Sequence, residues 1–448
     1  MNLLKAGFGR VNVNPMLGID ISGYFVERKA DGILDDLEVN ALALECGGKR
    51  AVFLCIDNLG IPRVTADKFR KHISERTGVD FDAIYMAETH THTAPTIVVS
   101  GMGELEEEYL QFAIRRAADA VKFALDDLAP AKMGYGIGSA PGVAFVRRYR
   151  MKDGSIKTNP GVDNPDIVEP VGEVDERVNV LRFDREGKET LVLVNFANHP
   201  DVVGGCKISA DWPGFLRRNV EKSIDNTKCI FFNGAQGDIN HVNVHPRGGD
   251  LNGMFMDFDD VSRGYPHSEH IGRVVAAGVL QVYSKVKYVD VDSIEYIQKD
   301  IKVASNMPRP EDMPEAHRIN DLHNAGRDRE LPYKGMMLTT VVAEAGRMVR
   351  LEHGPEAFEM PLSAVRVGPV GFIGIPGEPF NGIGRALKET EGFELIFPTC
   401  CTNGYEGYFP MQDSYDEGGY EARSSSFKAG VAEFIIEEGK KLLGEIRG

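Results

Sequence analysis

Several features that mark common protein classes are missing from this 448-residue chain. No stretch approaches the roughly twenty apolar residues needed to cross a bilayer, and the first residues lack the apolar run of a secretion signal. Cysteine is scarce: there are six residues and no Cys-x-x-Cys pair, which argues against a disulfide framework. We therefore expect a cytoplasmic protein with reduced thiols and no membrane insertion.

Basic charge is also low relative to acidic charge. The chain has 51 Lys and Arg against 67 Asp and Glu, for a formal net charge of −16. Nucleic-acid backbones and anionic membranes require a basic surface, so neither is expected as a partner. A small-molecule substrate remains possible, because a local site can carry charge of either sign. The sequence gives no indication of oligomeric state.

The usual short motifs of several enzyme classes are absent. The chain contains no Gly-x-Ser-x-Gly, no Gly-x-Gly-x-x-Gly and no Walker P-loop. The sequence therefore contains none of the usual motif evidence for a serine hydrolase, a dinucleotide oxidoreductase or a nucleotidase. The helical His-Glu-x-x-His of common metalloproteases is missing as well.

Apolar strand-like runs and amphipathic helix-like runs alternate along the chain, with 42% hydrophobic and 26% charged residues overall. We predict an α/β fold with a large mixed, mostly buried β-sheet core flanked by helices, formed as a single domain over residues 1–448. Strands are expected at 37–44 and 50–56, and helices at 65–77, 106–128, 215–223, 271–285 and 427–443. The polar stretches 151–174 and 307–332 are long for connections and are candidates for lids or rims around a site.

Polar residues follow several of the predicted strands. His90 and His92 come after an apolar run at 83–86, His199 follows another, and Glu378 follows a third. Ligands in open α/β sheets bind beyond the carboxyl ends of strands, so one site assembled from distant residues is expected there.

His90, His199 and Glu378 suit a catalytic metal with an open position for water. The metal would lower the pKa of that water and create a nucleophile. Simpler roles stay open: the histidines could be structural, Glu378 could cap the helix that follows it, and Asp57 could orient a ligand or lie in a turn.

Five short motifs occur in the order found in one known family. They are Thr89-His90-Thr91-His92, Asn198-His199, the run from Asn233 to Asp238, Gly377-Glu378-Pro379-Phe380, and the segment from Asn403 through Tyr408 to Tyr420-Glu421. Together they resemble the amino-terminal catalytic domain of the neutral ceramidases, the neutral/alkaline non-lysosomal ceramidase family, over nearly the whole chain.

The resemblance implies a zinc-dependent amidohydrolase, since that family cleaves the amide of N-acyl-sphingosines. The family's zinc ligands fall on His90, His199, Glu378 and Tyr408, with one zinc ion per chain. The resemblance further implies that His92 contacts the substrate carbonyl, that Arg147 assists at the site, and that Tyr420 lies near the reacting centre. Read from the residues alone, Tyr408 is an uncommon type of ligand and Arg147 could be surface charge.

The chain also departs from the family pattern. Asn240 replaces the family's serine in the loop after Asp238, and either Asn240, as a hydrogen-bond donor to an oxyanion, or His241, as a base, could serve instead. The family's immunoglobulin-like domain and secretion signal are not found in the sequence.

We therefore expect a zinc-dependent hydrolase that uses activated water on a small soluble amide, with an ester or lactone as further options. Two alternatives remain: a metal-dependent lyase or isomerase acting on a sugar acid, and a non-catalytic ligand-binding homologue.

Overall fold

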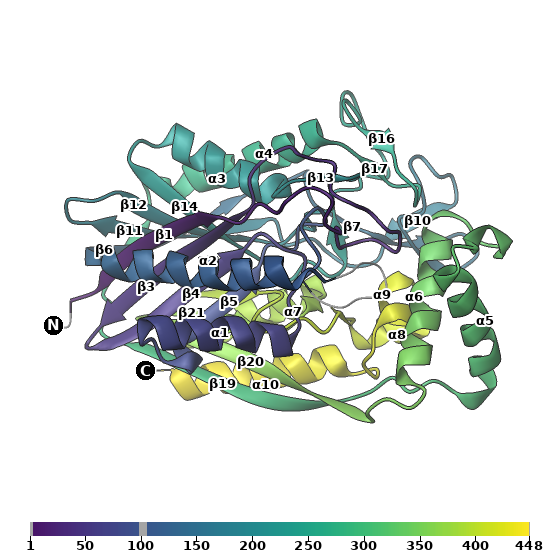
Figure 1. The fold of residues 1–448 in the computed structure, drawn as a ribbon. Coiled ribbons are helices and arrows are strands. Elements are labelled where there is room, and N and C mark those ends of the chain that lie inside the picture. Colours follow the sequence, from purple (N-terminus) through teal and green to yellow (C-terminus); the bar gives the residue numbers. More distant parts are fainter. Residues whose placement is uncertain (1–2, 98–104, 448) are drawn as a thin grey trace.

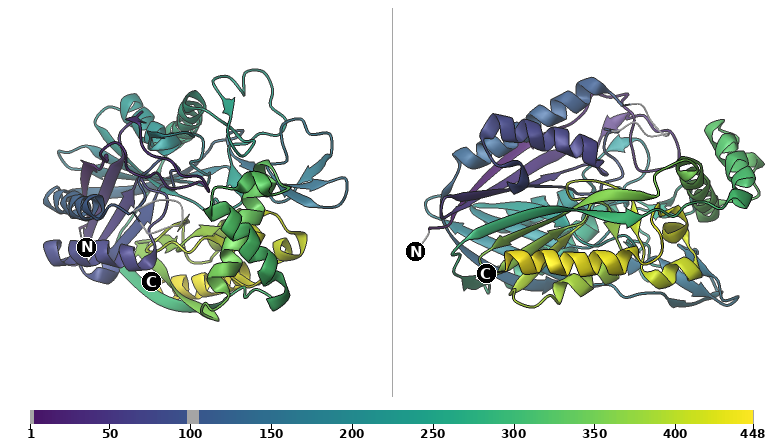
Figure 2. Two further views of the ribbon diagram at one scale, coloured as in Figure 1. Left: turned by 45° about the vertical axis from the view of Figure 1, so that its right-hand side comes forward. Right: turned by 90° about the horizontal axis from the view of Figure 1, so that it is seen from below.

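The structure, a computed structural model, describes residues 3–97 and 105–447. Two β-sheets lie face to face, with helices on both outer faces (Figures 1 and 2). The larger sheet has the order β14-β12-β11-β6-β1-β3-β4-β5, with β18 pairing to β6, and the smaller has the order β19-β20-β21-β23.

The strands of the larger sheet are β1 (Lys5–Asn12), β3 (Glu38–Cys46), β4 (Lys49–Ile56), β5 (Ile84–Glu88), β6 (Ala129–Ser139), β11 (Arg177–Arg185), β12 (Thr190–Phe196), β14 (Thr227–Asn233) and β18 (Lys287–Val289). Those of the smaller sheet are β19 (Ile294–Ala304), β20 (Ala357–Val367), β21 (Val370–Gly374) and β23 (Leu395–Thr399). Most neighbours are antiparallel, but β4 and β5, β12 and β14, and β21 and β23 pair in parallel. The prediction of a large mixed sheet flanked by helices is therefore confirmed.

The facing surfaces of the two sheets enclose an aromatic core. Phe53 of β4 lies 4.5 Å from Phe372 of β21, ring centroid to centroid, and Phe372 stacks on Phe397 at 4.8 Å. Along β21, Val370 and Phe372 belong to this core, whereas Ile373 packs on the other side against helices. The alternation of strand side chains thus gives each sheet two buried faces.

The helices form the outer layers. Those on the larger sheet are α1 (Arg63–Thr77), α2 (Glu107–Asp126), α3 (Asp211–Ser223) and α4 (Tyr265–Tyr283), and those on the smaller sheet are α7 (Asn381–Lys388) and α10 (Val431–Ile446). Each expected helix is present with shifted ends. The helices α3 and α4 begin earlier than expected because Pro213 and Pro266 lie in the first turn, where a backbone N–H has no partner in the helix anyway.

The polar stretch 307–332 is more ordered than its composition indicates. It contains α5 (Met313–Asn324), and α6 (Gly335–Leu351) follows directly. These helices, with α8 (Gln412–Glu417) and α9 (Tyr420–Ser424), lie together at one end of the sheets (Figure 1). The stretch 151–174 holds the short strands β9 (Ile156–Thr158) and β10 (Ile167–Pro170), which pair with β8 (Arg148–Met151).

Short strand pairs tie the loops beyond the sheet ends. They are β2 (Gly32–Ile33) with β13 (Lys207–Ile208), β7 (Phe145–Val146) with β15 (Ile239–Asn240), β16 (Phe255–Met256) with β17 (Ser262–Arg263), and β22 (Glu378–Pro379) with β24 (Tyr408–Phe409). Across 3–97 and 105–447, no helix has the length and apolar character needed to cross a membrane.

Candidate metal centre

Three side chains from three separate segments of the chain converge on one buried point. His90 follows β5, His199 follows β12, and Glu378 lies beyond β21. The Oε2 atom of Glu378 lies 3.2 Å from His90 Nε2 and 3.0 Å from His199 Nε2. Ligands about 2.0–2.1 Å from a tetrahedral zinc are separated by roughly 3.3 Å, so this spacing is close to that of ligands on one ion.

The hydrogen bonds around these side chains show why a cation fits between them. His90 Nδ1 lies 2.6 Å from the Leu59 carbonyl oxygen, and His199 Nδ1 lies 2.9 Å from that of Gln236. A carbonyl can only accept, so each Nδ1 carries the proton and each Nε2 of a neutral ring presents a lone pair. The two Nε2 atoms and Glu378 Oε2 have no hydrogen-bond partner. Three lone pairs facing one another need a positive charge among them.

Burial strengthens this requirement. His90, His199 and Glu378 are each 1% exposed. Burial of the His199 ring away from water lowers its pKa, and the charge of the nearby Arg147 lowers it further. A second proton on that ring is therefore disfavoured. The donor atoms of His90, His92 and His199 also lie close enough together to hold a metal ion. The residues present therefore fit a divalent metal.

His90 adopts a strained backbone conformation. Its φ is +71°, which is uncommon for a residue other than glycine. The chain leaves β5 at Glu88, and the His90 N–H donates to the Asn58 carbonyl at 2.9 Å, which holds the turn in place. Such strain is typical of functional positions, where surrounding contacts maintain it.

Glu378 is not a helix cap. The helix α7 begins at Asn381, whose N–H donates to Asp238 Oδ1 at 2.7 Å, so Asp238 fills the capping role. The other oxygen of Glu378, Oε1, accepts a 2.6 Å hydrogen bond from the hydroxyl of Tyr405. No motif in the sequence indicates a role for Tyr405, although it lies only three residues before Tyr408.

Tyr408 is placed beside Glu378 by strand pairing, since β22 and β24 set the two residues opposite each other. Burial and the charge of Glu378 raise the pKa of Tyr408, and the nearby Arg147 opposes this rise. The Tyr420 ring lies 5.5 Å from the Tyr408 ring. Both tyrosines thus line one side of the centre.

Arg147 is held from two sides. Its Nε donates to Glu421 Oε1 at 2.6 Å, and its Nη2 donates to the Gly237 carbonyl at 2.8 Å. The guanidinium carbon lies 5.4 Å from the centre of the Tyr408 ring. Arg147 is therefore buried in the site rather than a surface charge, and it acts on Tyr408.

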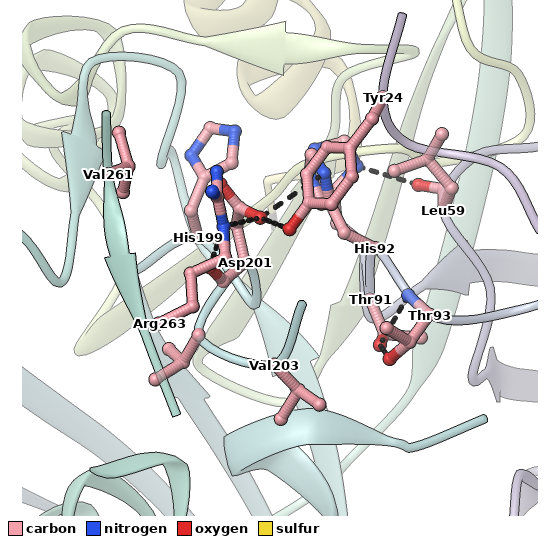
Figure 3. Close-up of polar contacts among 12 residues, drawn as sticks. Tyr24, Leu59, Thr91, His92, Thr93, His199, Asp201, Val203, Val261 and Arg263 are labelled. Carbon is pink, nitrogen blue, oxygen red and sulfur yellow. Dashed lines mark hydrogen bonds and ion pairs between the residues drawn. The ribbon is translucent and has the colours of Figure 1, made fainter. Parts of the chain in front are cut away.

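His92 lies on the other side of the centre, with its ring 5.0 Å from that of His90. Its Nδ1 is 3.6 Å from Oδ1 of Asp201, and neither of its ring nitrogens has a hydrogen-bond partner. Asp201 in turn accepts hydrogen bonds from Tyr24 and from Arg263, the latter at 2.9 and 3.0 Å (Figure 3). Gly23 passes so close that a Cβ there would lie 2.9 Å from His92 Nδ1. His92 is thus fixed by packing, with its polar atoms free.

Asn240 follows Ile239, whose carbonyl lies 3.0 Å from His199 Nδ1. The Asn240 amide donates to Asn159 Oδ1 at 3.1 Å and accepts from the Val242 N–H at 3.0 Å. His241 has its Nε2 2.8 Å from the Ser262 carbonyl, away from the His90 cluster.

In the described part of the chain, no hydrogen bond or ion pair joins Asp57 to His90 or His199. Asp57 pairs with both terminal nitrogens of Arg217 at 3.0 and 2.6 Å. Asp57 therefore has a structural role, and the residue that orients His90 is Leu59, through its carbonyl.

Comparison with solved structures shows the fold. The chain is similar to the neutral ceramidase from Pseudomonas aeruginosa, with a TM-score of 0.75 and 16% sequence identity over 100% of this chain and 75% of that one. It is also similar to a ceramidase complexed with C2, with a TM-score of 0.74 and 16% identity over 99% of this chain and 76% of that one. Neither protein-family models nor curated protein sequences give a match. The chain thus has the fold of a neutral ceramidase, as the sequence motifs predicted.

Proposed function

We propose that the protein is a metal-dependent hydrolase that acts on the carbonyl of a small soluble amide, with esters and lactones as related substrates. The observation that carries this proposal is the meeting of three unprotonated, unpartnered donor atoms from His90, His199 and Glu378 in a buried site. The fold shared with two ceramidases supports an amide as the substrate bond.

The proposed ligands of one zinc ion per chain are His90, His199, Glu378 and Tyr408. A divalent metal held there supplies a Lewis acid that polarises a carbonyl and acidifies water. The carbonyls of Leu59 and Gln236 keep the two ligand histidines in the tautomer with a free Nε2. The hydroxyl of Tyr405 donates to Oε1 of Glu378 and so fixes the orientation of this carboxylate.

The remaining side chains are proposed to handle the substrate. His92 contacts the substrate carbonyl. Burial lowers the pKa of its ring well below the usual value against the opposing charge of Asp201, so the neutral ring with a proton on Nε2 is the donor. Arg147, which lies near the Tyr408 ring, would polarise the Tyr408 hydroxyl. Tyr420, whose ring lies next to that of Tyr408, would assist the leaving group. Asn240 has one amide hydrogen left to donate in place of the family's serine. A positioned donor of this kind contributes roughly 3–4 kcal/mol to lowering the barrier.

Metal content of the purified protein tests the centre. Wild type should retain zinc after loading and dialysis, as measured by elemental analysis, and His90→Ala and His199→Ala should lose it. The matched control is His353→Ala, because His353 is 91% exposed and has only a weak contact at 3.9 Å with Glu352. Wild type that binds no zinc would rule out the proposal.

A further variant separates ligands from substrate contacts. His92→Ala should keep its zinc but lose roughly 100-fold or more in the hydrolysis rate of N-acyl anilides and p-nitrophenyl esters, as expected when one donor to the transition state is removed. Loss of zinc in His92→Ala would instead make His92 a ligand. Normal turnover in this variant would leave His92 without a catalytic role.

A further inference from the structure

A cavity of about 490 Å³ adjoins the candidate metal centre. Its inner wall contains Tyr405, Tyr408 and Tyr420, which are the three tyrosines beside Glu378 and Arg147. Its volume suits a ligand of the size of a small molecule. Because this cavity reaches the tyrosines of the centre, it is the space in which the rest of a bound substrate would lie.

The outer wall of this cavity is formed largely by α6 and the chain that follows it. Phe25, Leu351 and Phe358 make it apolar, so the wall suits a hydrocarbon chain or ring. Arg350, at the end of α6, is the one basic residue among its described lining residues. Arg350 therefore places a cation in the same wall as these apolar side chains.

Arg350 differs from the other arginines of this region, which are satisfied. Arg147 pairs with Glu421, Arg423 pairs with Glu344, and Arg347 donates to the carbonyls of Asn306 and Arg423. Among residues 3–97 and 105–447, no carboxylate lies within 4.0 Å of the Arg350 guanidinium and no hydrogen bond satisfies it. The Arg350 side chain is exposed, and the surrounding protein atoms lower its pKa by desolvation.

One carboxyl group, Glu406, also lines the cavity. No ion pair joins Glu406 to Arg350 within the part of the chain that the structure describes. The cavity thus holds one basic side chain without an ion-pair partner, although the whole chain has a net charge of −16.

We propose that the substrate carries a carboxylate at the end distant from the scissile carbonyl, and that Arg350 binds it. This proposal rests on the proposed function, because it assigns the substrate class of the same site. The guanidinium presents a planar pair of donors that matches a carboxylate. The apolar walls hold the short chain that separates the two polar ends. The substrate class is thus an amide or ester of a small acid with a second, free carboxylate.

Binding measurements on the zinc-loaded protein test the subsite without requiring turnover. The probes are the dicarboxylates from succinate to suberate and the monocarboxylates of equal chain length, titrated by calorimetry. At one chain length the dicarboxylate should bind about tenfold more tightly than its monocarboxylate, the size expected for one charge-assisted contact. This preference should disappear in Arg350→Gln and remain in part in Arg350→Lys.

The control variant is Arg329→Gln, because Arg329 is also an exposed arginine but does not line the cavity. It should bind both series as wild type does. Equal affinities of wild type for both series, absence of binding by either series, or a preference that survives in Arg350→Gln would each overturn the proposal.

Hydrolysis separates this proposal from the proposed function. The p-nitrophenyl half-esters of the same dicarboxylic acids serve as substrates. A binding preference without hydrolysis would leave the carboxylate subsite intact and refute the hydrolase. Equal rates of hydrolysis for half-esters and simple esters would support the hydrolase and refute the carboxylate subsite.

Discussion

The two oxygens of Glu378 have separate tasks. Oε2 faces the two histidines, whereas Oε1 accepts the Tyr405 hydroxyl at 2.6 Å. A hydrogen bond to the second oxygen fixes the rotation of the carboxylate and so keeps Oε2 aimed at the centre. Partners of this kind around metal ligands are worth roughly 10–100-fold in metal affinity or activity. The position of Glu378 therefore depends on a residue that lies outside the proposed ligand set.

Tyr405→Phe tests this dependence at the scale of one hydroxyl group. The variant should bind zinc about 10–100-fold more weakly, because the carboxylate loses its orientation. Competition with a chromogenic chelator measures the dissociation constant. Tyr135→Phe removes a tyrosine–glutamate hydrogen bond of the same length, 2.6 Å to Glu394, on the exposed surface and should leave zinc affinity unchanged. Equal zinc affinities in wild type and Tyr405→Phe would show that Tyr405 does not orient the ligand.

Residues near the centre differ in how well the sequence predicts them. The convergence of His90, His199 and Glu378 was predictable, since each follows an apolar strand within a short motif. Tyr405 was not, because a second tyrosine three residues later fits the family motif and no local pattern shows which hydroxyl faces which side chain. Asp201 next to His92 was missed for a related reason: its partners Tyr24 and Arg263 are distant in the chain.

At the scale of secondary-structure elements, a buried ion pair joins α3 to the end of β4. Both oxygens of Asp57 bind Arg217, and Oδ2 also accepts the Glu38 N–H at 2.9 Å. Both side chains are buried. The pair fixes the loop after β4, which contains the Leu59 carbonyl that holds His90. This loop is thus joined both to the structural ion pair and to the proposed metal ligand His90.

Arg217→Met should lower the free energy of unfolding by about 3–5 kcal/mol, because Asp57 would be left buried without its partner. Denaturant unfolding measures the change. The double variant Asp57→Asn/Arg217→Met should recover part of the loss, since no unpaired charge remains. Arg318→Met, which removes an exposed pair with Glu315, should cost less than about 1 kcal/mol. A small effect of Arg217→Met alone would contradict this account.

The elements themselves were predicted unevenly. The hairpin of β3 and β4 and the helices α1 and α2 match the sequence patterns because their apolar residues repeat regularly. The helix α5 was not predicted, since only Met313, Ala316 and Ile319 are buried on an otherwise polar helix. Its packing surface is supplied by α6, which local patterns cannot show. The wall that carries Arg350 could therefore be recognised only in the folded structure.

On the scale of the whole molecule, the candidate centre lies where the two sheets meet. His90 and His199 follow strands of the larger sheet, and Glu378 follows a strand of the smaller one. Between their facing surfaces, the two sheets are joined by the aromatic core around Phe53 and Phe372. A metal ion would be a second connection between the sheets, at the end where the lining of the proposed substrate cavity is also found.

Removal of the metal should therefore loosen the two sheets at that end only. Apo protein should lose about 4 kcal/mol of stability relative to protein with free zinc at about a thousand times its dissociation constant. Hydrogen exchange should rise in the loops after β5, β12 and β21 together, while α1 and α2 on the outer face stay protected. His90→Ala serves as the control, because chelation should change neither its stability nor its exchange. If exchange rose in only one of the two sheets, the ion would not bridge them. A rise confined to the loops after β5 and β12 would mean that Glu378 is not a ligand, and a rise confined to the loop after β21 would mean that His90 and His199 are not.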